Sequence, residues 1–199
     1  MKTKLLAGIT ICFILIGMIG MTHATTIDFE SFAQPGTDSD FYPSPFQTNG
    51  YQFVGNGIGN DYAILQTGAS DFTGSTALIP FSNESHTLSR IDGNSFDLVS
   101  MDIYERFVLL PGTFTFIGNF SAGGSIVQNV TLDGVLGGEQ FNFSGFENLL
   151  SVTFDVPGTF DVAMEIDNIV LSSPVPEPGT ILLFGVGLIG LAGVSRRKK

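Results

Sequence analysis

Short runs of alternating apolar and polar residues fill the stretch from residue 25 to residue 173. A period of two is typical of β-strands that bury one face and expose the other. Turn-forming dipeptides such as Pro-Gly, Asp-Gly and Asn-Gly separate the runs, and no window keeps a helical period. The clearest runs are Thr113–Ile117, Ile126–Leu132, Phe141–Phe143, Leu150–Phe154 and Phe160–Ile166. Roughly ten such strands predict an all-β fold, an antiparallel β-sandwich.

The run from Ser95 to Tyr104 changes phase partway along its length. Phe96 and Leu98 share one parity, whereas Met101 and Ile103 share the other. An extra residue on one strand shifts the alternation in this way. The sequence therefore predicts a β-bulge near Ser100.

The same stretch is strongly acidic. It keeps only Arg90 and Arg106 as cations against eighteen of the nineteen acids of the chain. Because phosphate recognition depends on clustered Lys and Arg, this composition excludes nucleic acid and anionic lipid as partners and favours divalent cations or basic partners. We expect both arginines to form ion pairs that hold strands together. The stretch contains no cysteine, so its stability depends on the core of one domain.

The N-terminal segment has the pattern of a secretory signal peptide. Lys2 and Lys4 precede an apolar run that ends at Met21, and small residues follow around Ala24. We predict a signal peptide over residues 1–24, handled by the Sec translocon and signal peptidase. The alternative is an uncleaved N-terminal anchor. Cys12 lies within the apolar run, where an ordinary hydrophobic cysteine is expected.

The C-terminal segment combines an extended peptide with a short apolar run. Pro174, Pro176 and Pro178 alternate, which favours a polyproline-like conformation, and Glu177 stands alone between two of them. The uncharged run 181–194 would reach about 21 Å as a helix, against ~30 Å of hydrocarbon in a bilayer. Four cations end it, namely Arg196, Arg197, Lys198 and Lys199. The segment predicts a temporary anchor in the inner membrane.

Pro176-Glu177-Pro178, the apolar run and the basic end together resemble a PEP-CTERM sorting signal. The resemblance implies an exported protein of a Gram-negative bacterium that makes extracellular polysaccharide. It also implies that exosortase recognises Pro-Glu-Pro and processes the tail, and that the protein then reaches the cell surface or matrix. The alternative is a plain C-terminal anchor on a proline-rich stalk. We divide the chain into a signal peptide (1–24), a sandwich domain (25–173) and a sorting signal (174–199), with a helix expected in each flank.

Several strand-like stretches of the body resemble jelly-roll domains that precede this sorting signal. They are Ile27–Glu30, Ser95–Ile103 and the closing stretch Asp167–Leu171. Such domains are similar to galactose-binding-like domains and carbohydrate-binding modules. The resemblance implies a jelly roll.

Residues with catalytic potential are sparse. His86 is the only histidine of the body, no nucleophile motif accompanies it, and zinc catalysis lacks its usual ligands. We expect a polar surface histidine and a non-enzymatic protein. Its predicted role is structural or adhesive in a polysaccharide biofilm matrix, with weak glycan contacts. The alternative is a secreted glycan-active enzyme with paired carboxylates, like a glycoside hydrolase.

Two sets of residues are candidate ligand sites. Tyr42 and Tyr51 lie among turn residues, where their rings either stack on sugars or cover the open end of the core. Asp28 and Glu30 are two residues apart on an expected strand and so share a face. With Asp167 of the closing strand they predict a calcium site; the alternative is an ordinary solvent-exposed face.

Overall fold

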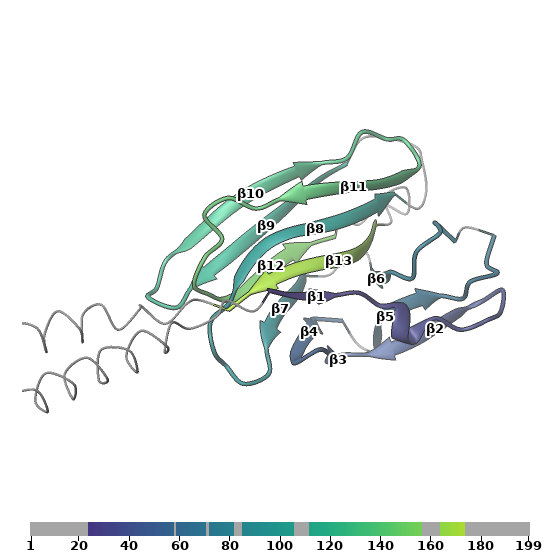
Figure 1. Cartoon of the computed structure of the whole chain (residues 1–199), viewed down its shortest axis with the longest axis horizontal. Helices are drawn as coiled ribbons and strands as arrows, with labels where there is room; N and C mark the ends of the chain where they lie inside the picture. The colour runs from purple at the N-terminus through teal and green to yellow at the C-terminus, as the bar shows by residue number, and fades with distance from the viewer. Residues whose placement is uncertain are drawn as a thin grey trace, which may run out of the picture. The chain divides into compact units, whose positions relative to one another are not determined.

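The computed structural model folds the body into two antiparallel sheets (Figure 1). It describes residues 24–57, 59–70, 72–81, 85–105, 112–156 and 164–173. The predicted sorting signal, and the signal peptide up to residue 23, lie outside the described residues, as do the helices expected there. In the part of the chain that is described, no helix has the length and apolar composition needed to cross a bilayer.

The first sheet has seven strands in the order β11-β8-β13-β6-β5-β2, with β1 paired to β13. Its strands are β11 (Gly137–Asn142), β8 (Asp97–Glu105), β13 (Met164–Ser172), β6 (Leu78–Pro80), β5 (Asn60–Leu65), β2 (Ser39–Pro43) and β1 (Ala24–Ile27). The second sheet has six strands in the order β10-β9-β12-β7-β4-β3. They are β10 (Ser125–Thr131), β9 (Thr113–Phe120), β12 (Leu149–Asp155), β7 (Ser85–Arg90), β4 (Tyr51–Gly55) and β3 (Phe46–Thr48). The prediction of an antiparallel jelly-roll sandwich is confirmed.

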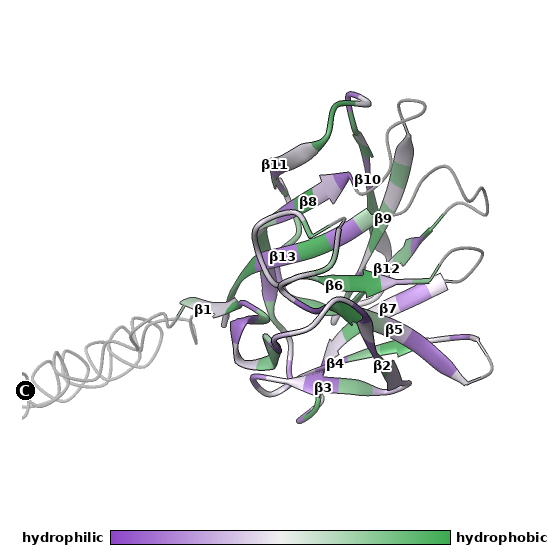
Figure 2. Cartoon of the chain, turned by 90° about the vertical axis from the view of Figure 1, so that its right-hand side faces the viewer, coloured by the Kyte–Doolittle hydropathy of each residue, from purple (hydrophilic) through white to green (hydrophobic). Residues whose placement is uncertain are grey.

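The core lies between the sheets and consists mainly of the inward residues of the alternating runs. On β9, Phe114 and Phe116 are fully buried, whereas Thr113 is exposed. Phe116 stacks on Phe154 of β12 with ring centroids 5.4 Å apart. Figure 2 shows hydrophobic and hydrophilic residues mixed along most of these strands. The described core belongs to one compact unit, His23–Pro174, so this part of the chain has the buried surface it needs to fold by itself.

One local prediction needs correction and another is confirmed. The expected strand Ile27–Glu30 ends at Ile27, and Glu30 begins a short 3-10 helix, η1 (Glu30–Phe32). Phe29, between β1 and this helix, is fully buried in the core, and the chain leaves the sheet at this residue. The predicted β-bulge near Ser100 is confirmed, because Val170 pairs with Ser100 and Leu171 pairs with Leu98, which leaves Val99 as an extra residue of β8. A second register irregularity lies on β13 between Asp167 and Val170, where Asn168 adopts a φ of 45°.

The predicted strand Phe160–Ile166 falls partly outside the described residues. Its last three residues, from Met164 on, begin β13, which continues without interruption through the predicted closing stretch. The two predicted elements therefore share one long strand at the centre of the first sheet.

The prediction of a surface histidine is wrong, because His86 is fully buried between the sheets. Its ring stacks on Phe154 at 5.6 Å. Nε2 lies 3.0 Å from the carbonyl oxygen of Phe81, and Nδ1 lies 3.2 Å from the hydroxyl of Tyr62. A carbonyl can only accept, so Nε2 carries the proton and Nδ1 accepts from the tyrosine in the neutral ring. Burial lowers the pKa of His86, which keeps the ring neutral at physiological pH.

This buried ring predicts a loss of stability in mild acid. Because the folded pKa of His86 is lowered, unfolding takes up a proton, and the stabilisation present above the unfolded pKa of about 6.5 is lost as the pH falls below it. The free energy of unfolding of the body should therefore decrease from pH 7 toward pH 5. His86→Gln, which cannot titrate, should remove this part of the slope. An unchanged slope in the variant would contradict the assignment.

Candidate functional site

The predicted calcium ligands lie where β13 meets the segment after β1. Asp167 on β13 is buried and accepts a hydrogen bond from the hydroxyl of Ser75 at 2.6 Å. The same hydroxyl lies 3.3 Å from Oε1 of Glu30, which also accepts from the backbone N–H of Thr76 at 3.1 Å. A serine hydroxyl has one proton, so the two carboxylates share a single donor. The structure thus brings Glu30 and Asp167 to opposite sides of Ser75; we call this group the β13 junction.

Asp28 takes no part in these hydrogen bonds. It is exposed, because β1 has already ended at Ile27 and the chain turns before Glu30. A different acid approaches instead: Asp102 of β8 is the register partner of Asp167. Sequence reasoning missed both Asp102 and Ser75, since their positions follow only from strand register and from the course of the connection before β6.

The carboxylates at and beside the β13 junction are only partly compensated by hydrogen-bond donors. Burial raises the pKa of Asp167, and the neighbouring charges of Glu30 and Asp102 raise it further, whereas the hydrogen bonds from Ser75 and from the backbone of Asn168 oppose this. One oxygen of Asp167 and one of Asp102 are buried and find no hydrogen-bond partner within the described part of the chain. A cation would lower the cost of burying these carboxylates. However, the ligand atoms of Glu30, Asp102 and Asp167 are not among the described acidic groups that converge within 4.8 Å.

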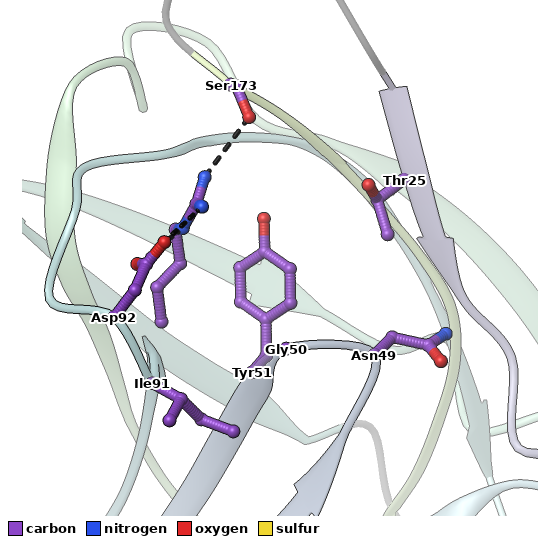
Figure 3. Close-up of a pocket in the computed structure, with 8 residues that line it drawn as sticks. Thr25, Asn49, Gly50, Tyr51, Ile91, Asp92 and Ser173 are labelled. Carbon is purple, nitrogen blue, oxygen red and sulfur yellow. Dashed lines mark hydrogen bonds and ion pairs between the residues drawn. The ribbon is translucent and has the colours of Figure 1, made fainter.

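Tyr51 lines a pocket of about 340 Å³ beside the last residues of β13 (Figure 3). Its ring is only 5% exposed and meets Phe96 edge-on at 5.6 Å, so it belongs to the core. In Figure 3 its hydroxyl points into the space between Ser173 and Thr25. The ring therefore offers a ligand its hydroxyl and not a face for stacking.

Arg90 forms one wall of this Tyr51 pocket. Its Nε donates to Asp92 at 2.9 Å and its Nη1 donates to Ser173 at 3.1 Å. The ion pair with Asp92 spans one turn, so the prediction that Arg90 joins strands by an ion pair is wrong; the link to the end of β13 is a hydrogen bond to Ser173. The hydrogen bond from Arg90 lowers the pKa of Asp92 to about 2. Arg106 lies outside the described residues.

Tyr42 lines a second pocket, of about 510 Å³, at the edge of the first sheet. Its ring meets Phe32 and Phe46 edge-on, at 5.8 and 5.2 Å, and is half-buried. Its neighbour Phe41 points outward and is 56% exposed. The remaining lining residues are Gln34, Pro35, Asp40 and Gln66. We call this the Phe41 pocket. Phe41, which directly precedes the predicted Tyr42, is the more exposed of the two rings, and it meets Phe81 edge-on at 6.1 Å.

Comparisons with known proteins identify the C-terminal segment. Residues 174–198 match the family model of the PEP-CTERM protein-sorting motif. No curated protein matches the chain.

Among solved structures, the chain is similar to a carbohydrate-binding module of family 29, with 16% identity and a TM-score of 0.44 over 77% of this chain and 90% of the module. A variant of such a module complexed with mannohexaose gives 16% identity and a TM-score of 0.43, over 77% of this chain and 93% of the module. These values are too low to transfer any residue or ligand. The sorting prediction is confirmed. The chain carries a PEP-CTERM protein-sorting motif at residues 174–198, which follows the β-sandwich in the sequence and is the signal of an exported protein that exosortase processes.

Proposed function

We propose that this protein is a non-enzymatic component of the extracellular polysaccharide matrix, exported, sorted and cleaved by exosortase. The observation that carries the proposal is the position of the sorting motif. It begins at residue 174, directly after β13 ends the sandwich at Ser172. The N-terminal signal peptide delivers the body across the inner membrane, and the C-terminal segment holds it there until cleavage. The mature domain then acts at the cell surface or in the matrix of a Gram-negative bacterium.

The two pockets favour binding over hydrolysis. Canonical glycoside hydrolysis needs a pair of carboxyl groups, one of them able to donate a proton. Among the described residues, the Phe41 pocket is lined by one acid, Asp40, and the Tyr51 pocket by one acid, Asp92. Asp92 is held ionised by Arg90 and so cannot donate a proton at neutral pH. Neither pocket therefore supplies the pair that a glycosidase requires.

The Phe41 pocket has the groups that a weak glycan contact needs. The exposed ring of Phe41 can cover the apolar face of a sugar, as aromatic side chains do. Asp40 accepts a 3.3 Å hydrogen bond from the amide of Gln66, and both side chains, with Gln34, can bond sugar hydroxyls. Tyr42 contributes the edge of its ring and its hydroxyl, while Tyr51 contributes only a hydroxyl to its own pocket. Since the body carries an excess of acids, the preferred glycan is neutral.

A glycan array and a hydrolysis assay on the purified sandwich domain test this proposal together. We expect weak binding to neutral polysaccharide and no product release. Phe41→Ala should weaken binding roughly tenfold, the effect of losing one aromatic contact. The matched control is Val127→Ala, because Val127 is 57% exposed but lies on β10 of the other sheet. Release of shorter sugars would establish the enzyme alternative, and equal losses in both variants would place the contact elsewhere.

A further inference from the structure

Three acidic side chains meet at the end of β8, apart from the β13 junction. Glu105 is the last residue of β8, Asp133 lies in the connection between β10 and β11, and Glu139 is on β11. One carboxylate oxygen from each lies within 4.8 Å of the other two. Ligands on opposite sides of a calcium ion, each about 2.4 Å from it, are themselves ~4.8 Å apart. The spacing therefore suits one ion surrounded by all three carboxylates.

The environment of the Glu105 carboxylate independently indicates a cation site. The Glu105 side chain is 6% exposed, and Oε1 accepts a hydrogen bond from the backbone N–H of Gly134 at 2.9 Å. The carboxylate therefore faces the connection that carries Asp133. Its other oxygen, Oε2, is buried and has no hydrogen-bond partner among the described residues. A buried carboxylate oxygen without a partner is costly, and two further acids beside it increase that cost.

The backbone around the cluster holds the other two carboxylates in place. The N–H of Val135 donates to Oδ1 of Asp133 at 2.8 Å, and the N–H of Asp133 donates to Oε1 of Glu139 at 3.3 Å. These donors orient the side chains but bring no positive charge. The ligand set is all oxygen, without histidine or cysteine, which suits calcium and not zinc.

We propose that Glu105, Asp133 and Glu139 bind a calcium ion that fastens the β10–β11 connection to the end of β8. β11 is an edge strand whose partner in the sheet is β8. The ion adds a second attachment at the point where the chain crosses from one sheet to the other. This cluster is distinct from the β13 junction. Asp102, the register partner of Asp167, lies three positions before Glu105 on β8, which is about 10 Å along the strand.

Thermal unfolding and calorimetric calcium titration of the stripped sandwich domain test the site. We expect calcium at a hundredfold excess over its Kd to raise the Tm by roughly 5–10 °C. Glu139→Gln should abolish this shift and, by removing one repelling charge, raise the Tm in chelator. The matched control is Glu147→Gln, which neutralises an exposed acid outside the cluster and should keep the shift.

Asp167→Asn separates the two acidic groups, because it removes the central carboxylate of the β13 junction and leaves the cluster intact. The calcium shift should survive this substitution. The proposal is overturned if the wild-type Tm is unchanged across millimolar calcium, if Glu139→Gln keeps the full shift, or if Asp167→Asn alone abolishes it. The last result would place the ion between Glu30 and Asp167.

Discussion

Replacing Pro176, Glu177 and Pro178 with alanine is expected to leave the full-length chain in the inner membrane. The three residues lie within the matched sorting motif, and the two prolines favour an extended peptide that presents one isolated carboxylate. Alanine removes both the preformed shape and the charge, so exosortase loses what it recognises. The effect should be close to all-or-none. Cell fractionation, with mass spectrometry of the C-terminus, measures it.

Pro174→Ala is the matched control, because it removes one proline of the same stretch and keeps Pro-Glu-Pro. This variant should be processed like the wild type, and the mature protein should lack the four terminal cations. Wild-type protein recovered from the cell surface with Arg196–Lys199 intact would show that the segment is a plain anchor.

Phe116→Ala is expected to produce the largest loss of stability of any variant described here. Phe116 is fully buried and contacts the rings of Phe154 and Phe143, at 5.4 and 5.2 Å. Truncation leaves a cavity between the two sheets, which costs about 3–5 kcal/mol. That is a large part of the ~5–15 kcal/mol that stabilises a typical domain. The Tm of the purified sandwich domain should fall by about 10 °C or more.

Val127→Ala is the control for this loss, since it also removes apolar atoms from the second sheet but from an exposed side chain. Its Tm should stay within a few degrees of the wild type, because exposed substitutions rarely exceed ~0.5 kcal/mol. Similar losses in the two variants would mean that the inward face of β9 is not the packed face.

The fold could be predicted because most of its strands bury only one face. In such a strand the alternation of apolar and polar residues shows which side chains point into the core, as it does for Phe114 and Phe116 on β9. The sorting motif was also predictable, since its parts follow one another along the chain. Both signals are local, and neither depends on which strand lies beside which.

The candidate sites depend on contacts between distant segments, so the sequence predicted them only in part. The jelly-roll resemblance joins the first and last strands, so the sequence could suggest that Glu30 lies near Asp167. Ser75, which contacts both carboxylates, comes from a connection that has no sequence signal. Glu105 and Glu139 meet only through the register of β8 with β11. His86 was misplaced because a polar residue in a run of polar neighbours was assumed to face solvent, whereas tertiary packing supplies its partners.

The central position of β13 has a mechanical consequence. Seven of its residues have register partners on β8, and β1 pairs with the last four from the other side (Figure 1). A force applied at Ser172 along the strand therefore loads two hydrogen-bonded ladders in shear, so that their bonds must slip together. A tether attached to an edge strand would instead unzip one bond at a time. Tension entering the domain at its C-terminal end is thus spread across the middle of the sheet before any strand can peel away.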